Sequence, residues 1–236
     1  MWQIPPFVMD IPESMRDDPL PEIPPTPGDD LSGFDRTLAA YCTAYNLDAS
    51  NIVYGIDNNA EDAPQFILYP PARSRRRQYT DLELLAILRT LRWNETICSI
   101  SFARIALDPL IGIVDPYGQE YEPRYLKGGR PLNLKVAQDN KSLLVYELRA
   151  LALYNTKLRR MDFSECISTG KDPTTQTGTQ GDKACAIIEA IMPLCRRGLT
   201  NVDWFVFTGV ELSEADLDWM SEFRPSTAKG TADADG

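Results

Sequence analysis

The fold is decided by a stretch of the chain that occurs twice. The first copy reads LLAILRTLRWNETICSISF over residues 84–102, and the second reads VYELRALALYNTKLRRMDF over residues 145–163. Asn155 follows Asn94 by 61 residues, and Phe163 follows Phe102 by the same 61 residues. A constant offset of this kind indicates stacked units, each of which buries its apolar side against its neighbours.

A third and weaker copy follows about 41 residues after the second. The stretch LTNVDW at residues 199–204 matches LRRMDF at residues 158–163, and it comes after a helix-like AIIEAIMPL at residues 186–194. In this alignment Trp204 takes the place of a buried phenylalanine. Pro193 is expected to interrupt the third helix, because a proline lacks the backbone N–H that a helix needs.

Each copy predicts a helix followed by a short strand. In the first copy a broad apolar face begins near Thr80 and ends close to Asn94, with a period that is typical of an amphipathic helix. The period then changes to two, so that Ile100 and Phe102 point inward while their neighbours point outward. Such units are expected to align their strands in parallel and to place their helices outside.

Asn94 and Asn155 fall at the predicted helix ends. An asparagine there tolerates left-handed backbone geometry, and its amide can satisfy unpaired backbone groups. The sequence therefore gives these two residues a structural role.

The pattern of a helix, an asparagine and then Leu-x-x-Leu-x-Leu-like spacing resembles leucine-rich repeats of the long, ribonuclease-inhibitor kind. Such repeats also occur in tropomodulin and in actin regulators of the CARMIL family, and residues 80–220 look most like the repeat region of large fungal leucine-rich-repeat proteins. The resemblance implies an α/β fold, a short leucine-rich-repeat solenoid with parallel strands inside and helices outside. It also implies cytoskeletal or small-GTPase-pathway proteins as partners.

The chain divides into four segments by composition. Residues 1–33 form a proline-rich acidic arm or linker, and residues 34–79 form an N-terminal helix-strand cap or degenerate repeat followed by a basic linker. Residues 80–223 form the leucine-rich-repeat-like region, which carries insertions at residues 111–139 and 168–183. The first insertion is interpreted either as an ordered binding element or as a plain spacer. Residues 224–236 read as a disordered tail.

Composition excludes several kinds of chemistry. The chain of 236 residues contains no histidine, which excludes Ser-His-Asp and Cys-His nucleophiles and histidine metal ligands. Its five cysteines form no CxxC pair, and a net charge of −10 argues against nucleic acid as a partner. We find no signal peptide and no phosphate-binding glycine motif. The expectation is a non-enzymatic cytoplasmic protein without a cofactor or metal.

Two sets of residues are candidates for binding. Polar positions that alternate with buried ones predict a protein-binding strand surface made of Ser99, Ser101, Arg160, Asp162, Asn201 and Asp203. The chain's one basic cluster predicts a weaker anion-binding site at Arg73, Arg75, Arg76 and Arg77.

The preferred interpretation is a protein–protein interaction module or scaffold. Three alternatives stay open, namely a purely structural segment of a longer chain, a protein that binds phosphoinositides or a membrane surface through Arg73–Arg77, and an enzyme with a deep pocket of converging carboxylates. The last predicted helix, near residues 212–220, either caps the stack with Trp219, Met220 and Phe223 or continues into a longer protein.

Overall fold

The computed structural model describes residues 31, 33–72, 78–111, 113, 142–166, 185–210 and 212–221. Within these residues, five short strands form one sheet, and their order in the sheet is their order along the chain. They are β1 (Tyr54–Asp57), β2 (Gln65–Leu68), β3 (Ser99–Ser101), β4 (Arg160–Asp162) and β5 (Trp204–Val206). β1 runs antiparallel to β2, and every later neighbour is parallel.

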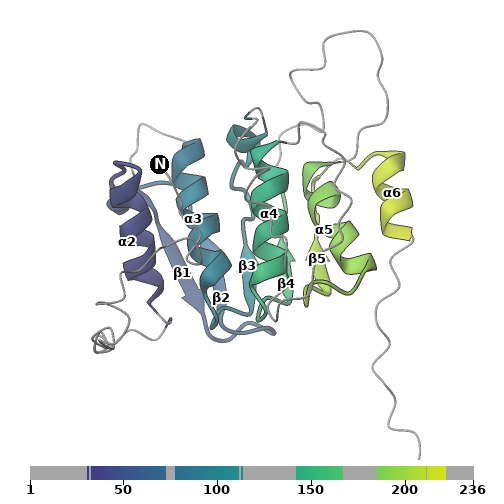
Figure 1. Ribbon diagram of the computed structural model, residues 1–236, viewed down its shortest axis with the longest axis horizontal. Coiled ribbons are helices and arrows are strands. Elements are labelled where there is room, and N and C mark those ends of the chain that lie inside the picture. The colour runs from purple at the N-terminus through teal and green to yellow at the C-terminus, as the bar shows by residue number, and fades with distance from the viewer. Residues whose placement is uncertain are drawn as a thin grey trace, which may run out of the picture.

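The helices stand side by side and cover one face of this sheet (Figure 1). They are α2 (Phe34–Ala44), α3 (Asp81–Trp93), α4 (Leu143–Tyr154), α5 (Ala186–Arg196) and α6 (Glu214–Ser221). Two short 3-10 turns, η1 (Ala49–Asn51) and η2 (Asp108–Leu110), lie between them. The predicted α/β class and the parallel alignment of β3, β4 and β5 are confirmed.

The boundaries of α3 follow from its sequence. Thr80 accepts a hydrogen bond from the backbone N–H of Glu83, and Glu83 accepts one from the backbone N–H of Thr80, which forms a capping box. Leu84, Leu88 and Leu91 then bury one face of α3 completely or nearly so.

α5 continues through Pro193, which was expected to interrupt it. A proline near the end of a helix removes only one N–H, and the buried residues on either side hold the helix in place.

The strands show that the third copy is aligned differently from the sequence-based prediction. Met161 lies opposite Ile100 and Phe205 lies opposite Met161, so the second offset is 205 − 161, or 44 residues rather than 41. With the correct offset, Phe207 is the counterpart of Phe163. The phenylalanines of the three copies, Phe102, Phe163 and Phe207, then form one stack. Ring centroids are 6.1 Å apart for Phe102 and Phe163, and 6.0 Å apart for Phe163 and Phe207.

The corrected offset also aligns the turn that follows each strand. Arg104 (φ 64°), Glu165 (φ 54°) and Gly209 (φ 71°) occupy the left-handed region at successive offsets of 61 and 44 residues. The backbone N–H of Arg104 donates to Ser164, and that of Glu165 donates to Thr208. The three turns are therefore hydrogen-bonded to one another in the same way as the strands.

The asparagines lock neighbouring units together. Asn155 accepts hydrogen bonds from the backbone N–H groups of Lys157 and Leu158, both at 3.0 Å, and donates to the carbonyl of Leu91 at 2.8 Å. Asn94 repeats this arrangement and donates to the carbonyl of Leu31 at 2.7 Å. Their φ angles of −76° and −78° lie outside the left-handed region, so that part of the prediction is wrong. The role in satisfying backbone groups is confirmed.

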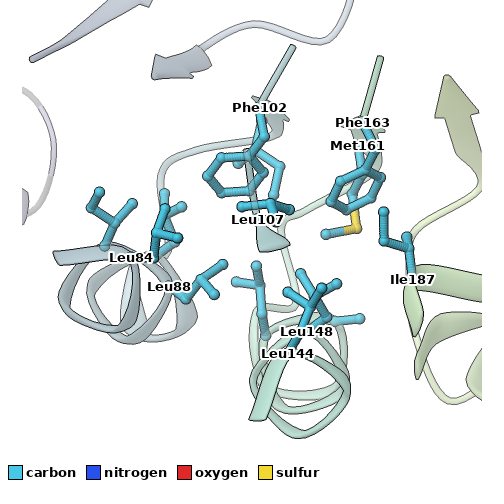
Figure 2. Packing of buried hydrophobic residues seen from close by; sticks show 14 of the residues in the cluster. Leu84, Leu88, Phe102, Leu107, Leu144, Leu148, Met161, Phe163 and Ile187 are labelled. Atoms are coloured by element: carbon cyan, nitrogen blue, oxygen red, sulfur yellow. The ribbon is translucent and has the colours of Figure 1, made fainter. Parts of the chain in front are cut away.

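The core fills the space between the helices and the sheet. Figure 2 shows Leu84, Leu88, Leu144 and Leu148 pointing from the helices toward Phe102, Met161 and Phe163 on the strand side. All of these side chains are at most 1% exposed. Burial of this kind stabilises a fold by roughly 25 cal/mol for each Å² of apolar surface removed from water.

A buried charge network joins three helices. Glu147 of α4 is 4% exposed and accepts hydrogen bonds from Arg89 and Arg92 of α3. Arg89 also donates to the hydroxyl of Tyr45, which follows α2. The Glu147 carboxylate raises the pKa of Arg89 against the lowering effect of burial. The helices are thus fixed laterally by charge as well as by apolar packing.

The last helix is fastened to the body by one carboxylate. Asp216 of α6 is 1% exposed, accepts a hydrogen bond from the backbone N–H of Cys185 at 2.7 Å, and forms reciprocal hydrogen bonds with Ser213. Its burial shows that Asp216 holds α6 in place and does not belong to a solvent-facing surface. Among the described helices, none has both the length and the apolar character needed to cross a membrane.

Candidate functional site

The face of the sheet turned away from the helices carries the candidate binding residues. The strand register places Ser99, Arg160 and Trp204 in one row across β3, β4 and β5. Ser101, Asp162 and Val206 form the next row. Side chains alternate between the two faces of a sheet along each strand. These two rows therefore lie on the face of the sheet that is turned away from the core. We call this surface the outer face.

Arg160 is the centre of the outer face. Its guanidinium carbon lies 5.3 Å from the centroid of the Trp204 ring, and its Nη1 lies 3.3 Å from Oε2 of Glu61 in the turn between β1 and β2. The Arg160 side chain is 26% exposed, whereas that of Glu61 is 76% exposed. An ion pair this open to water contributes little to stability, so it can be exchanged for another at low cost.

One nitrogen of Arg160 has no hydrogen-bond partner. Its Nε is buried and lies beyond hydrogen-bonding reach of any acceptor in the described part of the chain. A buried donor without an acceptor costs roughly 1–3 kcal/mol. Because Nε is covered while the side chain as a whole is 26% exposed, a further acceptor on this face would have to reach the other guanidinium nitrogens.

Asp162 is held in place by its neighbours. Ser101 Oγ donates to Asp162 Oδ2 at 3.1 Å, and the backbone N–H of Ser164 donates to Oδ1 at 2.9 Å. Asp162 is half-buried, and Ser101 is 7% exposed. The carboxylate therefore has one fixed orientation beside Arg160.

Two of the predicted contact residues are covered. Ser99 is fully buried, and its Oγ donates to the backbone carbonyl of Asp62 at 2.7 Å. Ser101 is buried by the contact with Asp162 described above. Both serines face outward as predicted, but they serve to position the β1–β2 turn and Asp162 instead of offering free hydroxyl groups.

Asn201 and Asp203 lie outside the two rows. Both are exposed and precede β5, and Asn201 donates to the carbonyl of Thr156 at 2.6 Å. The three-residue error in the third offset explains their misplacement, since it shifted this copy along the strand. The same error predicted Trp204 to be buried, although it is 52% exposed on the outer face. The spacing of 44 residues between Phe163 and Phe207 is the sequence signal that predicts the correct alignment of the third copy.

The basic cluster Arg73, Arg75, Arg76 and Arg77 lies outside the described residues. So do residues 1–30, the segment 114–141, the second insertion at 168–183 and the tail at 224–236. The hypotheses attached to these segments remain predictions.

Burial keeps the thiols of Cys166, Cys185 and Cys195 protonated at neutral pH. Burial raises the pKa of Cys166 and Cys185, and it raises the pKa of Cys195 to about 11. A protonated and buried thiol is a poor nucleophile and a poor metal ligand. Over the described residues, no group of three or more cysteine or acidic side chains is arranged to hold a metal ion.

Comparison of the chain with protein-family models, with curated proteins and with solved structures finds no match.

Proposed function

We propose that this chain is a leucine-rich-repeat-like interaction module that binds a protein partner on the outer face of its sheet. The repeat interpretation is supported by the in-register parallel strands, the phenylalanine stack and the asparagines that bridge neighbouring units. A rigid sheet of this kind presents side chains in fixed positions, which is a common basis for recognition.

One observation carries the choice of surface. Arg160 lies against the exposed ring of Trp204, and among the described residues its ion pair is with the solvent-exposed Glu61. Tryptophan and arginine are enriched among the residues that dominate binding energy at protein interfaces. The partner is expected to supply an acceptor for Arg160 and a surface that covers Trp204. A cytoskeletal or small-GTPase-pathway partner rests on the repeat resemblance alone.

A quantitative affinity purification tests the surface. The full chain is compared with a variant in which Arg160→Glu and Asp162→Lys exchange the two charges of the outer face. The matched control exchanges an exposed ion pair in the turns, Arg104→Glu with Glu165→Lys, whose side chains are 79% and 53% exposed.

We expect the outer-face variant to lose its specific partners by at least about tenfold, which corresponds to about 1.4 kcal/mol, while the control retains them. Circular dichroism and thermal unfolding establish that both variants are folded. Equal recovery of the same proteins by the intact chain and by the folded outer-face variant would show that the chosen surface is wrong.

A further inference from the structure

The β5 side of the sheet is an open and strongly apolar edge. Within the described residues, β5 has a neighbour on one side only. Phe205 occupies the same row as Ile100 and Met161, which are both fully buried, but Phe205 is only partly buried. Phe207, the last ring of the phenylalanine stack, is also partly buried.

The opposite end of the sheet is built differently, although β1 there is also an edge strand with one neighbour among the described residues. There the antiparallel hairpin of β1 and β2 ends the parallel series, and α2 packs on it through Phe34, whose ring lies 5.0 Å from Tyr54 and 5.3 Å from Phe66. At the β5 end, α6 covers the helix layer through its contact with α5, and Arg196 of α5 lies over the Trp219 ring at 5.0 Å. The strand layer at this end carries no comparable cover among the described residues.

The edge also lacks the residues that usually protect an edge strand. Monomeric proteins place charges, prolines or bulges on such strands, because an unpaired strand is a template for further pairing. Residues 204–207 read Trp-Phe-Val-Phe, with neither a charge nor a proline. Trp204, at 52% exposed, presents a large apolar ring on this strand.

The directions of the backbone N–H and C=O groups of Phe205 determine how a second strand can pair with β5. The carbonyls of Val206 and Thr208 accept hydrogen bonds from the backbone N–H groups of Phe163 and Glu165, which follow β4, so these carbonyls point toward the β4 side. Backbone groups alternate along a strand, and those of Phe205 therefore point toward the open edge. In an antiparallel sheet, two residues placed opposite each other with this orientation exchange both N–H and C=O bonds.

We propose that two copies of this chain associate through β5, with Phe205 paired to Phe205 of the other copy on a twofold axis. The strand is self-complementary in this arrangement, since Trp204 then lies opposite Val206 of the second copy and the core-facing residues remain on one side. A twofold contact is closed, so it yields a dimer and no fibre. The outer faces of both copies become one continuous surface, with the two Trp204 rings near its centre.

Sedimentation analysis of the full chain over a series of concentrations measures the association. We expect a concentration-dependent dimer, and we expect Trp204→Lys to weaken it at least about tenfold. Trp93→Lys is the matched control, because Trp93 is similarly exposed, at 56%, but lies at the end of α3. A chain that sediments as a monomer at every concentration overturns the proposal.

Disulfide trapping tests the register independently of affinity. A Trp204→Cys chain is mixed with a Val206→Cys chain under oxidising conditions, and the products are separated without reductant. The mixture should form a cross-linked dimer in greater yield than either variant alone, whereas the unmodified chain provides the background from its own cysteines. Equal yields from the mixture and from the single variants would overturn the antiparallel register.

Discussion

The side chain of Asn155 makes three hydrogen bonds at the boundary between two units. It closes the turn after α4 through two accepted hydrogen bonds and ties that turn to α3 through one donated bond. It is 2% exposed, so water cannot replace these partners. The third copy has no asparagine at this position. There Thr200 accepts from the N–H of Val202, and Asn201 makes the bond to the preceding unit.

Replacing Asn155 by alanine should therefore lower the free energy of unfolding by about 2–4 kcal/mol, since several buried backbone groups lose their partners. Asn201→Ala is the matched control, and it should cost less than about 1 kcal/mol because Asn201 is exposed. Urea denaturation followed by circular dichroism measures both changes. Similar losses for the two variants would contradict the role assigned to the buried amide.

At the scale of the element, the phenylalanine stack couples the three parallel strands. Phe163 is the middle ring and is fully buried, with Phe102 on one side and Phe207 on the other. Phe207 has a second neighbour in Phe205, at 6.0 Å, but its environment is only partly closed.

We expect Phe163→Ala to destabilise the protein by about 3–5 kcal/mol, through lost burial and the cavity left behind. Phe207→Ala should cost clearly less, because part of its ring already contacts solvent. Thermal and denaturant unfolding of the two variants compares them directly. A larger loss at Phe207 than at Phe163 would argue against the 44-residue offset that places Phe207 at the end of the stack.

The sequence predicted the elements well and the face of the third strand poorly. Helix-period residues and the cap at Thr80 define α3, and the exact 61-residue repetition aligns β3 with β4. The third copy lacks the asparagine that marks the boundary of each earlier unit, so the match of LTNVDW to LRRMDF selected the wrong alignment. A three-residue shift exchanges inward and outward positions along a strand, because the side-chain period is two.

The candidate site was predicted in part for a related reason. Arg160 and Asp162 lie on the outer face as expected, because their strand was aligned correctly. Glu61 was missed, since it reaches Arg160 from 99 residues earlier in the chain through a turn that shows no pattern of its own. The burial of Ser99 depends on that same turn. Contacts between distant segments of this kind leave no periodic signal in a single sequence.

At the scale of the whole molecule, the buried thiols and tyrosines give stability a defined dependence on pH. Burial raises the pKa of Cys166 and Cys185, raises that of Cys195 to about 11, and raises the pKa of Tyr79 and Tyr154. The unfolded chain releases these protons at lower pH than the folded chain does. Stability is therefore complete below the unfolded pKa values and is lost as pH rises toward the folded ones.

The free energy of unfolding should consequently fall as pH rises from about 9 to 11, by at most about 1.4 kcal/mol per pH unit for each such group. Urea titrations at a series of pH values measure the slope. Replacing both Cys166 and Cys195 by alanine should flatten it, whatever the variant's stability at neutral pH. An unchanged slope in that variant would show that these thiols do not contribute.

The Glu147 network and the proposed binding surface respond differently to ionic strength. Its arginines are only 17% and 12% exposed, so dissolved salt screens their attraction to Glu147 weakly. The pair between Arg160 and Glu61 faces water and is screened readily. Added sodium chloride should thus weaken the proposed attraction of a partner to Arg160 while the helices keep their arrangement, so salt elution should release such a partner from the folded chain.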